Sequence, residues 1–219
     1  MPLRDSSDQV SQQKLTHSAS QDEIDSQHQS SSAPAAQIPA SREHELAESD
    51  DPLVDLKIEG SGRALTHAAQ QLLRDGRSRF KTVHVFDFVP CNYEIFWDIL
   101  DAQPRGTFCE YGSGFGIATG LAELLGFDAL GIELSPDLVA ASRDLLTSQG
   151  LKARVEQGDY LQRRDMADIY FTYAWPSHMR LIERHFCKIA KPHTKLLYCH
   201  GQDDIRCKVL RSSVASTHA

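Results

Sequence analysis

One run of the chain reads Phe108-Cys109-Glu110-Tyr111-Gly112-Ser113-Gly114-Phe115-Gly116, a short apolar strand that ends in three closely spaced glycines. A helix-forming stretch, residues 117–125, follows at once. Glycine lets a backbone approach a ligand closely, and the free N–H groups at the start of a helix point toward whatever is bound there. The run therefore predicts a strand, a glycine turn and a helix N-terminus that together bind a nucleotide-like ligand.

Downstream of Gly106, strand-like and helix-like patterns alternate regularly. Strands are expected at residues 107–111, 129–134, 153–156, 168–173 and 195–200. The helix after the second strand has Ser135 as its cap, Pro136 at its first position and Gly150 at its end, the usual asymmetry of helix termini. Strands separated by helices form right-handed crossovers and a parallel sheet with helices on both faces. The predicted fold is therefore a doubly wound α/β fold with a mostly parallel sheet.

The segment before this alternation, residues 52–105, is expected to form a helical cover over the sheet edge and the ligand mouth. Residues 53–58 could form a short strand or an apolar anchor. Residues 63–74 have the apolar spacing of a helix, and Gly76 is expected to end it. Residues 80–89 have the pattern of an extended run. Asn92 is then a cap for a second helix with one buried face.

The two ends of the chain are polar. Residues 1–51 are rich in Ser, Gln, Asp and Glu and nearly lack large apolar side chains, so they cannot bury enough surface to offset their ordering entropy. We expect a disordered tail there. After the last predicted strand only about twenty residues remain, and an alternating run at 205–209 would add at most one edge strand. Residues 106–211 are thus expected to form the ligand-binding domain, and residues 212–219 a polar tail.

Size and composition limit the class of protein. A chain of 219 residues is long enough for one domain with a sizeable core plus a tail. Its formal net charge of −7, without a basic run, argues against a general binder of nucleic acid or acidic membranes, though not against one small local contact. The five cysteines lack any C-x-x-C pair, which favours free thiols in a reducing cytoplasm over a zinc site, so no metal is expected. No stretch approaches a membrane span and residues 1–10 have no signal-peptide core, which predicts a soluble, cytoplasmic protein.

The ends of the first two predicted strands carry glycines and acids. In an open parallel sheet, ligands bind outside the carboxyl ends of the strands. Glu110 with Gly112, Gly114 and Gly116 closes the first strand. Glu133 ends the second, at the spacing where an acidic side chain can accept hydrogen bonds from both ribose hydroxyls.

The next two strand ends add further candidates. Asp159 follows the third strand, where a carboxylate can accept a hydrogen bond from an adenine amino group, and Tyr173-Ala174-Trp175-Pro176 ends the fourth. Asp159 could instead be a helix cap or a turn former, and Trp175 a packing residue. The joint spacing of a glycine loop, an acid about twenty residues on and a second acid after the next strand favours a bound adenosine-containing cofactor.

The form of the glycine loop indicates which cofactor. The dinucleotide fingerprint G-x-G-x-x-G would need glycine at the position of Ile117. The chain has E-x-G-x-G-x-G instead, which resembles motif I of the class I S-adenosylmethionine-dependent methyltransferases, over about residues 90–200. The resemblance implies a Rossmann-like fold, here shortened because a full member of the family continues into a sixth and a seventh strand. It also implies S-adenosylmethionine as the cofactor. The implied cofactor-binding residues are Glu110, Gly112, Gly114, Gly116, Glu133, Leu134, Asp159 and Tyr160.

A finer resemblance concerns the acceptor. Val89-Pro90 followed by a short helix, the glycine loop and Gly131-Ile132-Glu133-Leu134-Ser135-Pro136 is similar to the small protein-lysine methyltransferases of archaea and their mitochondrial relatives. This likeness implies a protein lysine as the methyl acceptor. The motif [DN]-P-P-[YF], which serves methylation of amino groups on bases in the wider family, is absent, and a nucleic-acid acceptor is therefore disfavoured.

The chemistry of the transfer suggests the remaining site residues. Methyl transfer from a sulfonium needs orientation more than acid–base catalysis. A lysine must also lose its proton, which an aromatic, desolvated mouth favours, and aromatic faces can hold the ammonium group. Tyr93, Tyr173 and Trp175 are the candidate catalytic residues, and His200 could be a base or merely solvated. A small-molecule acceptor and a non-catalytic cofactor-binding module remain alternatives, and a nicotinamide oxidoreductase is disfavoured by Ile117.

Overall fold

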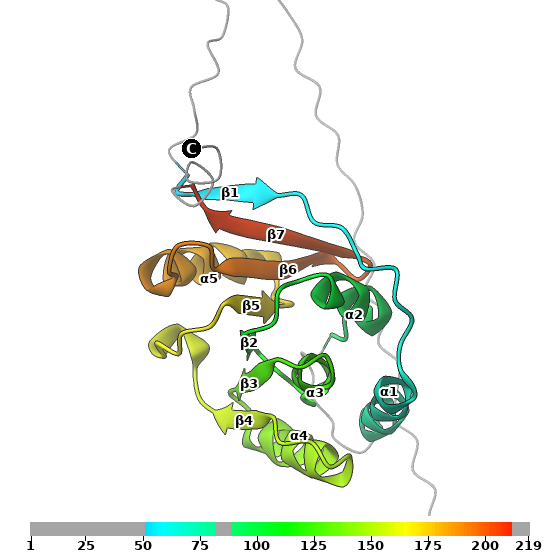
Figure 1. The fold of residues 1–219 in the computed structure, drawn as a ribbon. Helices are drawn as coiled ribbons and strands as arrows, with labels where there is room; N and C mark the ends of the chain where they lie inside the picture. Colours follow the sequence, from blue (N-terminus) through cyan, green and yellow to red (C-terminus); the bar gives the residue numbers. More distant parts are fainter. Residues whose placement is uncertain (1–50, 82–88, 212–219) are drawn as a thin grey trace, which may run out of the picture. The chain divides into compact units, whose positions relative to one another are not determined.

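The computed structural model describes residues 51–81 and 89–211. These residues contain a seven-stranded sheet in the order β1-β7-β6-β5-β2-β3-β4 (Figure 1). The strands are β1 (Leu53–Leu56), β2 (Thr107–Tyr111), β3 (Asp128–Glu133), β4 (Arg154–Gln157), β5 (Ile169–Thr172), β6 (Lys195–Gly201) and β7 (Asp204–Leu210). The helices are α1 (His67–Arg79), α2 (Tyr93–Asp101), α3 (Ile117–Leu124), α4 (Pro136–Ser148), the short 3₁₀ helix η1 (Tyr160–Gln162) and α5 (Pro176–Ile189). Residues 1–50 of the predicted N-terminal tail, the predicted C-terminal tail at 212–219 and residues 82–88 of the predicted extended run lie outside the described residues.

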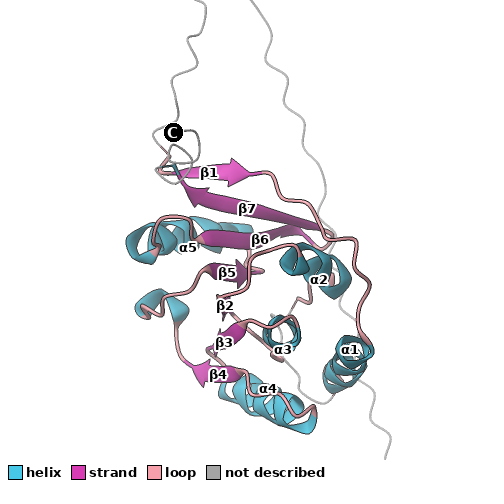
Figure 2. Ribbon diagram, viewed as in Figure 1, coloured by secondary structure: helices cyan, strands magenta, loops and turns pink. Residues whose placement is uncertain are grey.

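The predicted doubly wound fold is confirmed. Strands β4, β3, β2, β5 and β6 are mutually parallel, and each overlaps a range predicted from the sequence. The predicted caps are present as well, since the Asn92 and Ser135 side chains accept hydrogen bonds from the first-turn N–H groups of α2 and α4. Figure 2 shows the helices joining successive strands of this parallel part.

The expected shortening of the sheet needs a correction. Strand β7 runs antiparallel to β6, and β1 runs antiparallel to β7 at the edge, with Leu53 opposite Leu210 and Leu56 opposite Cys207. Of the two roles left open for residues 53–58, the strand is the one observed. Leu53 is only 5% exposed, so the segment gains both backbone pairing and apolar burial by joining the sheet. A strand from the start of the domain thus supplies an edge that the residues after β6 could not complete alone.

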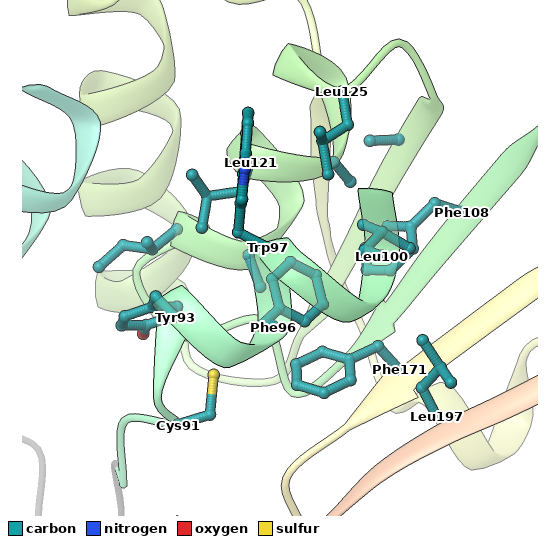
Figure 3. Close-up of a cluster of buried hydrophobic side chains, with 14 of the residues drawn as sticks. Cys91, Tyr93, Phe96, Trp97, Leu100, Phe108, Leu121, Leu125, Phe171 and Leu197 are labelled. Atoms are coloured by element: carbon teal, nitrogen blue, oxygen red, sulfur yellow. The ribbon is translucent and has the colours of Figure 1, made fainter. Parts of the chain in front are cut away.

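Helices cover both faces of the sheet. Residues of α1, α2 and α3 pack on one face, and residues of α5 and η1 pack on the other. Figure 3 shows Phe96 and Leu100 of α2 beside Phe108, Phe171 and Leu197 of the sheet. The ring centroids of Phe96 and Phe171 are 4.5 Å apart. Burying side chains of this size contributes about 1.5–3 kcal/mol each, which fixes α2 against this face of the sheet.

Gly76 does not end α1, as the sequence pattern had suggested. The helix continues to Arg79, and Gly76 is buried within it against α3. A Cβ atom at this position would lie 2.6 Å from Cδ1 of Ile117, so glycine permits close helix packing here rather than a stop. Among the residues that the structure describes, no helix is long and apolar enough to cross a membrane.

Candidate functional site

Three glycines turn the chain from β2 into α3. Gly112, Gly114 and Gly116 have φ angles of 72°, 54° and 71°. These values lie in the left-handed region, which L side chains adopt only at a cost. The E-x-G-x-G-x-G pattern is therefore explained by backbone geometry at each of its glycines.

The N–H groups of this loop are largely used within the protein. Gly112 and Ser113 both donate to the carbonyl of Ile132, at 2.9 and 3.1 Å. The N–H of Gly114 donates to Oε2 of Glu133 at 2.8 Å. At the start of α3, where free N–H groups were expected, the N–H of Thr119 is also used, since it donates to Oε2 of Glu110. A phosphate would find few free donors here and two carboxylates nearby, so the loop suits a ligand without phosphates.

Glu110 lies beneath the loop and caps α3. Its Oε2 accepts hydrogen bonds from the backbone N–H and the hydroxyl of Thr119, at 2.8 and 2.5 Å. The residue at the N-cap position, Gly116, has no side chain to do this, so a carboxylate from β2 takes the role. Burial raises the pKa of Glu110 from 4.5 to about 8, the hydrogen bonds from Thr119 oppose this shift, and the charge of Glu133 adds to it.

Glu133, at the end of β3, is oriented by two backbone groups. Its Oε2 accepts from Gly114 and its Oε1 accepts from the N–H of Ser135, at 2.9 Å. The side chain is buried yet lines a cavity, and each carboxylate oxygen has a second lone pair. The acid is therefore fixed in place and still able to accept hydrogen bonds from a ligand.

A cavity of about 430 Å³ opens beside the glycine loop, at the carboxyl ends of β2, β3 and β5. Most of the side chains predicted for the site line it. These residues are Tyr93, Glu110, Gly112, Gly114, Glu133, Leu134, Tyr160, Tyr173 and Trp175. The structure thus brings the candidate cofactor-binding and catalytic residues together at one rim of the sheet, where a parallel sheet binds its ligands.

Two predicted residues lie outside this lining. Gly116 is turned toward α4, where a Cβ atom would come within 2.9 Å of Cβ of Ser142. Asp159 accepts hydrogen bonds from the N–H of Leu161 and from Nε2 of Gln162, both at 2.9 Å. The structure shows Asp159 as the cap of η1, the alternative role considered for it, and its adenine contact stays a prediction.

Large apolar side chains are exposed around the mouth of the cavity. Leu134 is 68% exposed and Trp175 is 53% exposed, and Val89 lies at the same rim. Tyr160 stacks on Tyr111 with ring centroids 4.8 Å apart and an angle of 10° between the planes. Tyr93 is buried, and its burial raises the pKa of the phenol. Apolar groups exposed together at a cavity are typical of ligand sites.

Several lining residues were not predicted. Cys91, Ser113, Ser135 and His178 belong to this group. The Oγ atom of Ser113 is buried without a hydrogen-bond partner among the described residues. Its position between two motif glycines was a signal that could have identified it, whereas His178 reaches the cavity only because α5 begins directly after Trp175.

A second cavity, of about 630 Å³, adjoins the first and lies between α5 and the strands β6, β7 and β1. The two cavities share Val89 and the segment from Tyr173 to Trp175. His200, considered as a base from the sequence, is exposed and lines the second cavity. The segment at the end of β5 is thus the wall between two adjacent hollows.

Comparison with solved structures shows the fold. An RNA methyltransferase from Salinibacter ruber, in complex with S-adenosyl-L-homocysteine, matches 56% of this chain and 93% of its own, with 18% identity and a TM-score of 0.50. Two further structures are similar at lower TM-scores. A methyltransferase from Podospora anserina, bound to the same compound, has 14% identity and a TM-score of 0.49, and the match covers 62% of this chain and 63% of that chain. An O-methyltransferase from Bacillus cereus has 17% identity and a TM-score of 0.47, and the match covers 61% of this chain and 66% of that chain. No family model matches, and no curated protein matches. The match to the Salinibacter structure and the strand order of the sheet show that the chain has the Rossmann-like fold of a methyltransferase.

Proposed function

We propose that the chain is an S-adenosylmethionine-dependent methyltransferase that holds the cofactor in the cavity beside the glycine loop. The observation that carries this proposal is the convergence of Glu110, Glu133 and a loop with few free N–H groups on one cavity. Such a site repels a pyrophosphate but suits a nucleoside with a positively charged sulfonium and ammonium. When bound, the cofactor supplies a methyl group on a cationic sulfur.

Each lining residue then has a proposed role. Glu133 would accept hydrogen bonds from the ribose hydroxyls with its remaining lone pairs. Leu134 and Tyr160 would contact the adenine as apolar surfaces. Glu110 would offset the positive charge of the cofactor, because a cationic ligand favours the ionised form of this acid. Asp159 could reach the adenine only by giving up part of its cap on η1. Gly112 and Gly114 would let the backbone approach the ligand, since a Cβ atom at either position would be strained.

A nicotinamide dinucleotide fits this site poorly. Its fingerprint would place glycine where Ile117 stands, and Ile117 is buried in the contact between α3 and α1. Its pyrophosphate would also meet the carboxylate of Glu133 and few free N–H donors. Both observations favour the sulfonium cofactor.

For the acceptor, we propose an amine, with a protein lysine as the first candidate and a small molecule as the second. Tyr93, Tyr173 and Trp175 line the cofactor cavity on the side where the acceptor would meet the methyl group, and aromatic faces bind ammonium groups. The Salinibacter protein is named as an RNA methyltransferase, but the net charge of −7 gives this chain little attraction for a phosphate backbone. The cytoplasm is the proposed compartment.

The experiment that tests this function is methyl transfer by the full chain. The protein is incubated with a cell extract and S-adenosylmethionine labelled in its methyl group, and label is counted in precipitated protein and in the small-molecule fraction. We expect label that depends on the protein and is reduced in the Glu133→Ala variant. Cofactor binding without label in either fraction would support a non-catalytic binding module instead.

A further inference from the structure

We propose that the second cavity is the acceptor site and that it selects a cationic amine attached to a compact apolar group. This inference rests on the proposed function, since an acceptor must bind beside the methyl donor. The shared wall of Tyr173, Ala174 and Trp175 puts the two cavities next to each other. A volume of about 630 Å³ is within the range of pockets that enclose small ligands or a side chain with its neighbours.

The walls of the second cavity are mostly apolar and aromatic. Pro176 and Met179 of α5 form one side, and Tyr198 of β6 lies on the sheet side. Trp175 is exposed at the junction with the first cavity. Contact with these side chains favours an apolar body, while the aromatic faces at the junction can hold an ammonium group before it loses its proton.

The charges in the cavity favour a cation. Nζ of Lys208 lies 2.6 Å from Oε1 of Glu183 and 5.7 Å from the centroid of the Tyr198 ring. The Arg206 guanidinium is paired with Asp204 at 2.7 Å. Both basic side chains of the lining therefore have a carboxylate partner, and neither is free to attract an anion.

Asp55 is the one carboxylate in the described lining of the second cavity that is not paired with a basic side chain. It lines the cavity from β1, opposite Lys208 in the strand register, and it has no ion pair within the described residues. With Asp204 counted as the partner of Arg206, three carboxylates (Asp55, Glu183 and Asp204) face two basic side chains (Lys208 and Arg206), so the cavity and its rim carry an excess of one negative charge. An ammonium group gains from this excess, and a carboxylate or phosphate on the ligand is repelled.

The edge strand is thus part of the site. Asp55 is present in the cavity only because Leu53–Leu56 pairs with β7. The strand that completes the sheet also supplies the group that we infer to select the acceptor.

Tryptophan fluorescence gives a direct test that does not depend on turnover. The chain has two tryptophans. Trp97 is 1% exposed in the core and Trp175 is 53% exposed at the cavity, so a ligand there changes the emission of Trp175. The full chain, saturated with S-adenosylhomocysteine, is titrated with three molecules of matched size: 2-phenylethylamine, 2-phenylethanol and 3-phenylpropionate. We expect saturable binding of the amine and at least tenfold weaker binding of the carboxylate, and no signal in the Trp175→Phe variant.

Variants assign the selectivity to Asp55. Asp55→Asn should weaken 2-phenylethylamine binding about three- to tenfold and leave 2-phenylethanol binding unchanged. The control is Glu59→Gln, which removes an exposed acid of the same segment that does not line the cavity. A lysine peptide and its Nε-acetylated form are then added as competitors of 2-phenylethylamine. Displacement by the lysine peptide alone supports a protein lysine as the acceptor, and displacement by neither peptide supports a free amine. Equal displacement by the acetylated form, which has no charge, would contradict amine selection.

Equal or tighter binding of the carboxylate, or no saturable change with any of the three molecules, would overturn the inference. Calorimetry with S-adenosylhomocysteine on the same samples keeps the two proposals apart. Loss of that binding would refute the cofactor assignment. Normal cofactor binding with no preference for the amine would refute only the acceptor assignment.

Discussion

The carboxylate of Glu133 accepts a hydrogen bond from the backbone N–H of Gly114 at 2.8 Å. This contact joins an acid at the end of β3 to the glycine loop that follows β2. It holds the loop in a left-handed turn and fixes the acid at the cavity wall. The two sequence signals, which are 19 residues apart, therefore form one structural unit.

Glu133 is expected to contribute directly to cofactor affinity. Glu133→Ala should weaken binding of S-adenosylhomocysteine by about 1–3 kcal/mol, because a pair of ribose hydroxyls and the Gly114 N–H would lose their acceptor. Isothermal titration calorimetry measures the change, with Asp144→Asn, an exposed position on α4, as the control. Unchanged affinity in Glu133→Ala would remove this residue from the site.

Glu110 should make stability depend on pH. Its pKa is about 8 in the folded chain, against 4.5 for an ordinary glutamate, chiefly because the group is buried. The folded state therefore keeps a proton that the unfolded state releases, so the free energy of unfolding should fall as pH rises from about 4.5 to 8. Urea unfolding of the wild type and of Glu110→Gln at several pH values tests this. In Glu110→Gln the free energy of unfolding should fall less between pH 4.5 and pH 8 than in the wild type. The same pH dependence in both proteins would contradict the raised pKa of Glu110.

The same group should link cofactor binding to proton release. A cationic ligand in the cavity favours the ionised form of Glu110, so binding of S-adenosylmethionine should strengthen as pH rises toward about 8. Calorimetry in buffers with different ionisation enthalpies measures the protons released. We expect release in the wild type and much less in Glu110→Gln. Equal release in both proteins would assign the proton to another group.

Two glycines with nearly the same φ separate backbone strain from crowding. Gly116 (φ 71°) faces Cβ of Ser142, whereas Gly150 (φ 70°) has open space around it. Gly150→Ala should cost about 1–2 kcal/mol of stability from the left-handed conformation alone. Gly116→Ala should cost about 1–3 kcal/mol more, from overpacking against α4. Thermal and urea unfolding of both variants measures the difference. Equal losses of stability would show that Ser142 can move aside without an energetic cost.

Truncation should distinguish the polar N-terminal segment from the edge strand. Composition predicts that removing residues 1–50 leaves the melting temperature nearly unchanged. Removing residues 1–57 deletes β1 with the buried Leu53, and the melting temperature should drop clearly. The longer truncation also removes Asp55 from the second cavity. A large drop with the shorter truncation would contradict the prediction for residues 1–50.

The fold was predictable from local patterns because each parallel strand is buried and each crossover helix has its own caps. Ser135 and Asn92 are caps in the structure as their positions predict. The edge strand was harder, since Leu53–Leu56 pairs with β7, about 150 residues later in the chain. Gly76 was misleading for a similar reason, because its role depends on Ile117 of another helix.

The part of the candidate site that lies at the ends of β2 and β3 could be predicted, because the spacing of the motif residues indicates where these strands end. Glu110 and Glu133 lie at the ends of the strands that position them, and the loop glycines follow β2 directly. The hydrogen bonds that occupy the loop N–H groups depend on the partner strand β3, and they could not be derived from the loop sequence. The second cavity depends on β1, β7 and α5 together, so no single motif indicates it.

The central claim is that the cavity beside Gly114 binds an adenosine-bearing sulfonium. Calorimetry of the full chain with S-adenosylmethionine and, separately, with NAD tests it most directly. We predict saturable binding of S-adenosylmethionine, at one site per chain, and no measurable binding of NAD. Tight binding of NAD, or no binding of S-adenosylmethionine, would contradict the account.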